Sequence, residues 1–455
     1  MQKYNFDQNV RRRGTGCVKW DEVPEGFTAE EMQDVVPLWV ADMDFAVAPA
    51  IQEAVRRRAE HPVFGYTVVG DEYYDAVISW FRRRHGWTIR REEILYTTGV
   101  VPAMSVAIKA LTMPGERVLI LSPDYNCFFS SIINNGCQVG ESILKPTPCP
   151  SQREGRKDSS VAEGGQCSAA EGGQCSVAEG GQCSVAEDDH CSVAKGDFAP
   201  LPSGGARGWA IDWSDFESQC ADEKTTVFLL CNPHNPTGRV WTREELGRMN
   251  DICLRHGVKV VSDEIHCELT MPGYTFQPFA AVSEACRQNS VILNSPSKSF
   301  NIAGLQAANI ICANAEWRRR LNRAININEV CDLNPFGPVA LVAAYNESED
   351  WIDELCQYLW QNYLALCEFV ARELPQLEVS RLEGTYLPWV DVSRLGVPVE
   401  QLCDRLLREG RVWVNPGTMY GPVSGRGYVR LNIACPRAQL MEGLRRIKRV
   451  VMQYE

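Results

Sequence analysis

Residues 226–263 read "TVFLLCNPHNPTGRVWTREELGRMNDICLRHGVKVVSD" and contain one complete unit of strand, helix and strand. The apolar run "TVFLLC" ends in a turn rich in Asn and Pro, and "VKVVSD" is a second short apolar run. Between them, "TREELGRMNDICLRHG" has helical periodicity and opens with a Thr-x-x-Glu capping box at Thr242 and Glu245. Short buried strands joined by a helix are typical of a parallel sheet.

The same alternation continues on both sides of this unit. "RVLILSP" at 117–123 and "SVILNSPSKS" at 290–299 are further apolar runs that end in turn residues. We therefore expect an α/β domain with a mostly parallel sheet. Ligands of such sheets bind beyond the carboxyl ends of the strands, so the polar residues after each run are candidates for chemistry.

Composition and charge narrow the class of protein. The chain has 455 residues, of which 45% are hydrophobic and 23% charged, as in an ordinary globular enzyme of more than one domain. Its formal net charge of -12 argues against nucleic acid or an anionic membrane as partner, because both select basic surfaces. The first residues lack the apolar core of a secretory signal, and no apolar run reaches the roughly 18 residues of a membrane span.

Nineteen cysteines are spread along the chain, many in apolar segments such as "VFLLCNP" and "ANIICAN". A free thiol behaves there as a small hydrophobe. No pair has the C-x-x-C spacing of a structural zinc or redox site, so we expect no metal. Reduced thiols and a first segment without a signal predict a cytoplasmic protein.

The pattern changes after residue 325. Residues 338–374 form long helical stretches, and "TYLPWVDV" and "YVRLNIA" follow as short strands. These elements predict a second, smaller α+β domain over residues 326–455, which the N-terminal segment 1–45 completes. The large domain then spans residues 46–325.

One stretch interrupts the large domain. Residues 147–207 are rich in Ser, Gly, Ala, Glu and Gln, so they cannot bury enough apolar surface to offset their ordering entropy. They contain four copies of an octapeptide such as "SVAEGGQC", each with one cysteine. The cysteines are spaced more widely than in a usual zinc knuckle, and the copies lack the apolar face of a stacked repeat. We interpret the stretch as an insertion, with a metal or redox role as the alternative.

Two charged residues directly follow predicted strands. Lys298 lies in a Ser-rich turn, where a lysine can simply be a solvated surface charge. The functional alternative is a Schiff-base lysine, whose amine becomes nucleophilic and basic on burial and whose neighbouring hydroxyls bind a phosphate. Asp263 either caps a helix or, if buried, keeps a pyridine nitrogen protonated so that pyridoxal phosphate can act as an electron sink.

Three further turns carry candidates. Asn235 in "NPHNPTG" either shapes a rigid loop or presents its amide to a ligand hydroxyl. The amides of Gly99, Val100 and Val101 open a predicted helix and could cradle a phosphate, although a glycine before a helix is also a common structural feature. Tyr125 either stacks on a flat cofactor or packs in the core.

The order of these motifs, each after a strand, resembles a known group of enzymes. Over nearly its whole length except the insertion, the chain is similar to the fold-type I pyridoxal-phosphate enzymes of the class I and II aminotransferase superfamily. Within that group it resembles the branch of cystathionine β-lyases, also called carbon-sulfur lyases. The shared motifs are "TTGVV", "PDYNCF", "NPHNPTG", "SDEIH", "SPSKSFN" and "YVRLNIA". The motifs typical of the branch are "RRRGTGCVKWD", "LWVADMDF", "FGYT", "TYLPWVDV" and "VNPGTMYG".

The resemblance implies a three-layer αβα large domain and a role for each candidate residue. Lys298 would form the Schiff base, Asp263 would pair with the pyridine nitrogen, and Asn235 would donate to the phenolic oxygen. Tyr125 would stack on the ring. His266 takes the place of a tyrosine that approaches the phenolic oxygen in many aminotransferases, which suits the lyase branch.

The resemblance also implies how the phosphate is held. Ser295, with Ser297 and the amides after Gly99, would bind it, and Tyr66 would reach it from the second subunit of a homodimer. Gln306 departs from the pattern, because many aminotransferases have a phosphate-binding arginine at this position. The phosphate must then rely more on hydroxyls and amides.

An amino-acid substrate follows from the same resemblance. Arg430 would grip its carboxylate with a planar fork, and Ala41 would add a backbone contact. The implied reaction is elimination from L-cystathionine or a related cysteine S-conjugate, which gives a thiol, pyruvate and ammonia. A transaminase removes the Cα proton with the same residues, so these residues leave both reactions open. A cofactor-binding regulator is the alternative from another class.

Overall fold

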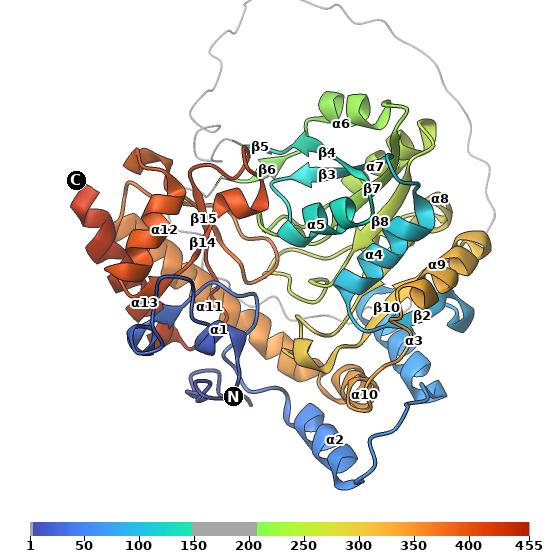
Figure 1. Ribbon diagram of the computed structural model, residues 1–455, viewed down its shortest axis with the longest axis horizontal. Coiled ribbons are helices and arrows are strands. Elements are labelled where there is room, and N and C mark those ends of the chain that lie inside the picture. Colours follow the sequence, from blue (N-terminus) through green and yellow to red (C-terminus); the bar gives the residue numbers. More distant parts are fainter. Residues whose placement is uncertain (1–2, 148–206, 455) are drawn as a thin grey trace, which may run out of the picture.

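The computed structural model describes residues 3–147 and 207–454 and contains one large central sheet between two layers of helices (Figure 1). Seven strands form this sheet in the order β2-β10-β9-β8-β7-β3-β4. They are β2 (Ile94–Thr97), β3 (Arg117–Ser122), β4 (Gln138–Ile143), β7 (Thr225–Cys231), β8 (Lys259–Asp263), β9 (Ser290–Asn294) and β10 (Ala308–Ile311).

Most neighbours in the sheet run parallel. β3 pairs with β4 and β7, β7 with β8, and β8 with β9, all in the parallel direction. β10 pairs in the antiparallel direction with both of its neighbours, β9 and β2. The predicted mostly parallel α/β sheet is therefore confirmed, and β3, β7, β8 and β9 are the strands that the apolar runs predicted.

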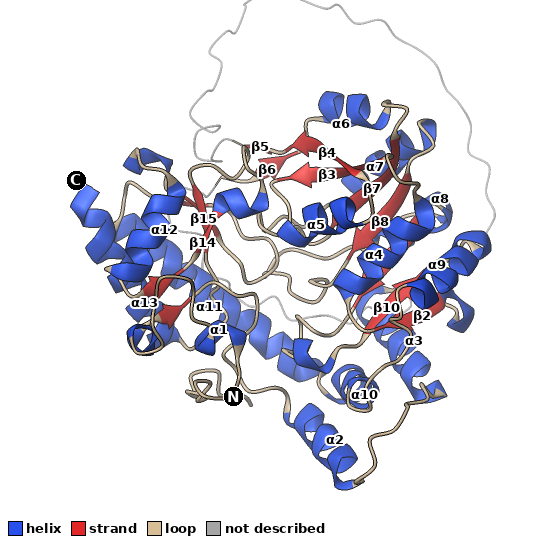
Figure 2. Cartoon of the chain, in the orientation of Figure 1, coloured by secondary structure: helices blue, strands red, loops and turns tan. Residues whose placement is uncertain are grey.

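Alternate side chains of the strands enter two different cores. In β7, Val227 and Leu229 pack with α4, whereas Phe228 and Leu230 pack in the core that contains α7. The helices therefore form layers on both faces, as expected of a three-layer αβα domain (Figure 2). One layer contains α4 (Val100–Leu111), α5 (Asn126–Asn134) and α9 (Ala315–Ile327), and the other contains α6 (Trp213–Cys220), α7 (Arg243–Arg255) and α8 (Glu284–Gln288).

Helix α7 begins as the sequence predicts. The Thr242 hydroxyl accepts a hydrogen bond from Glu245 N over 3.1 Å, and the Glu245 carboxylate accepts one from Thr242 N over 2.9 Å. This reciprocal pair satisfies two amides that would otherwise lack a helical partner. α4 begins at Val100, directly after Gly99, so its first turn lies just beyond the carboxyl end of β2.

A smaller sheet lies in the C-terminal part of the chain. Its order is β11-β12-β15-β14, and β1 (Val36–Pro37) pairs in parallel with β13 (Val412–Trp413), so the blue N-terminal segment meets the red C-terminal part (Figure 1). This pairing favours the predicted grouping of residues 1–45 with 326–455, and the boundaries stay a prediction. The strands are β11 (Glu378–Val379), β12 (Trp389–Asp391), β14 (Asn415–Pro416) and β15 (Tyr428–Arg430), and the helices are α10 (Gly337–Glu347), α11 (Glu349–Glu373), α12 (Val399–Arg408) and α13 (Arg437–Val451).

Three more helices and several single turns complete the described chain. Within residues 3–147 and 207–454, none of the helices has the length and apolar character that a membrane span requires. The helices are α1 (Val18–Asp21), α2 (Pro49–Glu60) and α3 (Asp71–His85). The turns are η1 (Glu31–Asp34), η2 (Arg91–Glu93), η4 (Phe279–Ala281), η5 (Ala303–Leu305), η6 (Ser393–Leu395), η7 (Gly417–Tyr420) and η8 (Met452–Tyr454).

The segments that flank the predicted insertion belong to one pair of strands. β5 (Lys145–Pro146) pairs antiparallel with β6 (Trp209–Ala210), and Thr147 N donates to Gly208 O over 2.8 Å. The octapeptide copies, with Cys167, Cys175, Cys183 and Cys191, lie outside the described residues. The chain therefore leaves and re-enters the large domain at one place.

Candidate active site

A pocket of about 270 Å³ opens at the carboxyl ends of the central strands. Its walls come from the first turn of α4 and from the turns that follow β3, β7, β8 and β9. Of the predicted site residues, it brings together Ala41, Gly99, Val100, Val101, Tyr125, Asn235, Asp263, His266, Ser297 and Lys298. Residues predicted from separate turns thus line a single cavity, which lies where an open α/β sheet binds its ligands.

Lys298 lies in the turn after β9, half-buried in the pocket wall. Its Nζ donates to the carbonyl oxygen of Ala41 over 2.7 Å. Burial lowers the pKa of Lys298, and the positive charge of Arg430 lowers it further, while Asp42 opposes this shift. An amine of lowered pKa is a better nucleophile and base near neutral pH, so Lys298 is not an ordinary solvated surface lysine.

Asp263 is the last residue of β8 and is buried at the base of the pocket. Its Oδ1 accepts from Ile265 N over 3.1 Å, and burial raises the pKa of the carboxyl to about 7. A buried carboxylate without a positive partner is costly. A ligand that brings a cationic N–H group to this place would remove that cost.

His266 follows three residues later and is also buried. Burial lowers the pKa of His266 to about 3, and the charges of Lys298 and Arg430 act in the same direction. The ring is therefore neutral at physiological pH, and its Nδ1 has no hydrogen-bond partner among the described residues. A neutral imidazole with one unpaired nitrogen can serve a polar group of a bound ligand.

Arg430 is the last residue of β15 and is 3% exposed. Its Nη1 donates to Asn235 Oδ1 and its Nη2 to Trp39 O, each over 3.1 Å. The guanidinium lies 4.5 Å from the centre of the Tyr420 ring, a cation–π distance. A buried guanidinium whose hydrogen-bond acceptors in the described residues are all neutral suits a carboxylate, which supplies a negative charge.

The phosphate end of the predicted site is the first turn of α4. Gly99, Val100 and Val101 line the pocket there together with Ser297. Ser295 does not line it: its hydroxyl donates to Ala307 O over 2.6 Å and lies 2.6 Å from Ser297 Oγ. Ser297 therefore lines the pocket, whereas Ser295 lies outside it and contacts the Ser297 hydroxyl.

Tyr66 does not line the pocket of its own chain and is 97% exposed.

Several residues of the pocket wall were not predicted from the sequence, and they contribute to the shape of the pocket rather than to its charge. Thr98 lies in the motif "TTGVV", directly before Gly99, so the sequence pointed to it. The other missed wall residues have no recognisable sequence signal. The missed wall residues are Thr98, Pro102, Cys231, Ile265 and Ala303, with Gln306 beside them at the position that departs from the pattern.

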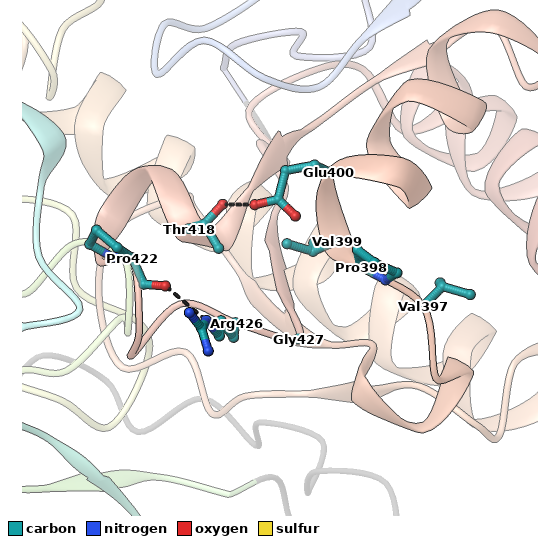
Figure 3. Close-up of a pocket in the computed structure, with 8 residues that line it drawn as sticks. All are labelled: Val397, Pro398, Val399, Glu400, Thr418, Pro422, Arg426 and Gly427. Atoms are coloured by element: carbon teal, nitrogen blue, oxygen red, sulfur yellow. Dashed lines mark hydrogen bonds between the residues drawn. The ribbon is translucent and has the colours of Figure 1, made fainter.

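A second hollow, of about 480 Å³, lies on the C-terminal part between α12 and the loop before β15 (Figure 3). The Thr418 hydroxyl donates to Glu400, and Arg426 donates to Pro422 O over 3.1 Å. None of its lining residues belongs to the predicted site. Without a reactive amine or a buried charge, this hollow has no comparable chemistry.

Fold and pocket together define an enzyme of the aminotransferase type. The chain matches the family "Aminotransferase class I and II" over residues 33–146 and 188–447, and it belongs to this family.

Individual relatives share nearly the whole chain. Cystathionine beta-lyase PatB of Bacillus subtilis (strain 168) is 37% identical over 444 residues, which cover 98% of this chain and 99% of PatB. Protein MalY of Escherichia coli (strain K12) is 31% identical and covers 97% of both chains. The solved structure of cystalysin from Treponema denticola, which contains a pyridoxal 5'-phosphate cofactor, superposes with a TM-score of 0.81 at 28% identity and covers 99% of this chain and 100% of cystalysin.

Proposed function

We propose that this chain is a pyridoxal-phosphate-dependent carbon-sulfur β-lyase that acts on L-cystathionine or a related cysteine S-conjugate. The observation that carries the proposal is that Lys298 and Asp263 line one pocket, while Arg430, which does not itself line it, donates to the wall residue Asn235. A reactive amine, a buried carboxyl and a planar guanidinium correspond to the three groups that a cofactor aldehyde, a pyridine nitrogen and a substrate carboxylate require.

The residues of the pocket fit pyridoxal 5'-phosphate. The amides at the start of α4 and the Ser297 hydroxyl suit the phosphate, and Gln306 lines the pocket beside them. Asp263, whose buried carboxyl has no ion pair among the described residues, suits the pyridine nitrogen. His266 Nδ1, unpaired among the described residues, and Asn235 suit the phenolic oxygen, and Tyr125 suits the ring face.

When bound, pyridoxal phosphate supplies an electron sink for a bond that breaks at the substrate Cα. Arg430 binds the α-carboxylate through two parallel N–H groups and so fixes the orientation of Cα. Lys298 then removes the Cα proton, and its lowered pKa leaves part of the amine unprotonated for this purpose. Asp263 keeps the proton of the ring nitrogen in place.

The lyase is tested by its products. Purified protein is incubated with L-cystathionine and no keto acid, and pyruvate and free thiol are measured over time. Steady release of both in equal amounts supports the proposal. The lysine variant Lys298→Ala should release neither, and it should lose the visible absorbance of the lysine-bound cofactor, which controls for contaminating activity.

An aminotransferase is the second candidate, because the family includes that activity and the same residues remove the Cα proton. It predicts a single turnover that stops until a keto acid is added. A regulator that only binds the cofactor predicts no spectral response to any amino acid. The chain retains Lys298, Asp263, Asn235 and Arg430, and this complete set of residues argues against a regulator without catalytic activity.

We also propose that the protein forms a homodimer and that it is located in the cytoplasm. Residues 63–68 present an apolar surface to solvent, with Val63, Phe64 and Val68 each more than half exposed and Tyr66 almost entirely so. Apolar segments of this kind mark contact surfaces. A second subunit would cover the segment and bring Tyr66 to the phosphate of its neighbour. Buried free thiols such as Cys253 support a reducing compartment.

A further inference from the structure

Five consecutive backbone carbonyls, from Trp39 to Met43, each accept a hydrogen bond from a side chain of another part of the chain. We call these residues the 39–43 segment. The donors are Arg430 and Asn415 to Trp39 O, Asn432 to Val40 O, Lys298 and Tyr386 to Ala41 O, Asn432 and Lys19 to Asp42 O, and Arg12 and Asn301 to Met43 O. The segment is thus fixed by groups from the whole fold, and two of them belong to the proposed active site.

Ala41 O is the point where the segment meets Lys298. This oxygen accepts from Lys298 Nζ over 2.7 Å and from the Tyr386 hydroxyl over 2.9 Å. A carbonyl oxygen has two lone pairs, so it can hold both donors at once. Tyr386 is 0% exposed, and its ring packs edge-on against His266 with the centroids 6.0 Å apart. The Tyr386 hydroxyl and the Lys298 amine are therefore held on the same carbonyl oxygen.

The backbone before Tyr386 is held in an unusual conformation. Thr385 has φ of +68°, which a β-branched residue adopts only under strain. Strain of this kind persists only where surrounding contacts enforce it. Thr385 N donates to Leu269 O over 2.6 Å, and its Oγ1 accepts from Leu387 N over 3.2 Å. The fold therefore enforces the turn that aims Tyr386 at Ala41.

We propose that Tyr386 is a positioning residue for Lys298: by fixing the Ala41 carbonyl, it holds the free amine of Lys298 in one place in the pocket. The inference rests on the proposed function in that Lys298 is taken as the reacting amine. Arg430 donates to a different carbonyl of the segment, Trp39 O, over 3.1 Å. Loss of the Tyr386 hydroxyl therefore acts on the amine and leaves the carboxylate clamp in place.

The first test uses cofactor-free protein and the variant Tyr386→Phe, which removes one hydroxyl. The probe is trinitrobenzenesulfonate, and the label on Lys298 is measured by peptide mass spectrometry across pH. Once the Ala41 carbonyl can turn away, the ammonium group of Lys298 loses its acceptor, so half-maximal labelling should move to lower pH. An unchanged midpoint, or one at higher pH, overturns the proposal.

Tyr363→Phe is the matched control. Tyr363 is also 0% exposed, and its hydroxyl donates to Ser380 O over 3.0 Å, but it does not line the pocket. Its loss should cost similar stability and leave the labelling midpoint unchanged. Equal shifts in both variants would reduce Tyr386 to a merely structural role and overturn the proposal.

A second variant covers the case in which Tyr386→Phe does not fold. Thr385→Gly tolerates the positive φ without strain, but it removes the hydroxyl that accepts from Leu387 N and so frees the backbone on both sides of Tyr386. It should shift the midpoint in the same direction, and a midpoint equal to that of the wild type overturns the proposal.

Holoenzyme gives the third measurement. A misplaced base should lower kcat for L-cystathionine about tenfold or more, whereas KM should stay within about twofold because Arg430 is untouched. A rise in KM at constant kcat contradicts the proposal. If wild-type protein releases no thiol at all but the labelling midpoint still shifts in Tyr386→Phe, the proposed function fails and the positioning role stands.

Discussion

Arg430 Nη1 donates to Asn235 Oδ1 over 3.1 Å, although the two residues are 195 positions apart in the chain. The bond joins the end of a strand in the smaller sheet to the turn after β7 in the central sheet. One side of the pocket therefore depends on both sheets. A substrate carboxylate that binds Arg430 also meets the residue proposed to hold the cofactor.

Arg430→Lys should weaken carboxylate binding without unfolding the protein. Lysine keeps the charge but cannot donate through two parallel N–H groups. The loss of one charge-assisted hydrogen bond corresponds to about 2 kcal/mol, or roughly thirtyfold in KM for L-cystathionine. The measurement is a steady-state KM, with cofactor absorbance as the control for an intact site. An unchanged KM would place the carboxylate elsewhere.

Asp263→Asn should change how the stability of cofactor-free protein depends on pH. Burial raises the pKa of Asp263 from 3.8 to about 7, so the folded state holds this proton more tightly than the unfolded chain. Its stabilising contribution is present at low pH and is lost as the pH rises through 7. Relative to wild type, the variant should gain up to about 1.4 kcal/mol per pH unit between about pH 5 and pH 7. Tm curves of both proteins against pH test this, and parallel curves would refute it.

Tyr66→Phe should reveal whether the second subunit completes the site. If Tyr66 of the neighbouring subunit donates to the phosphate, loss of the hydroxyl should weaken pyridoxal phosphate binding roughly tenfold. Dimers mixed from Tyr66→Phe and Lys298→Ala chains then contain one site with both groups intact. At limiting cofactor, their activity should exceed the sum of the two parent proteins. No gain on mixing would mean that Tyr66 acts within its own chain or not at all.

Replacing residues 148–206 with a short Gly-Ser turn should leave activity in place. The pairing of Lys145 with Ala210 and of Pro146 with Trp209 already brings the two ends together. Loop closure changes by only about 0.6 kcal/mol for each doubling of length, so the shorter connection costs the fold little. Cofactor absorbance and kcat/KM for L-cystathionine should both stay within about twofold of wild type. Loss of both in a soluble protein would assign the octapeptide copies a role in the site.

The sequence predicts much of this molecule because local patterns determine local structure. Asp263 and Lys298 could be placed at one edge of the sheet since each lies at or just after the end of an apolar run with the length of a buried strand. The capping box of Thr242 is local in the same sense.

The remaining contacts depend on residues far apart in the chain. Tyr386 lies in a motif that indicated the family, yet its bond to Ala41 spans 345 positions, and no spacing rule reports such a contact. The direction of the Ser295 hydroxyl, toward Ala307 rather than the pocket, is a rotamer that only packing decides. The role proposed for Tyr66 lies across two subunits, so no contact within one chain reports it.

Cys231 ends β7 and forms part of the pocket wall, so a sulfur atom lines the chamber in which a thiol would be produced. Burial raises the pKa of the Cys231 thiol well above its usual range, and the nearby carboxyls of Asp124 and Asp263 act in the same direction. Only a thiolate attacks a disulfide, and a thiol held protonated does so very slowly. A mixed disulfide at Cys231 should therefore form only slowly, even where oxidised thiols are present.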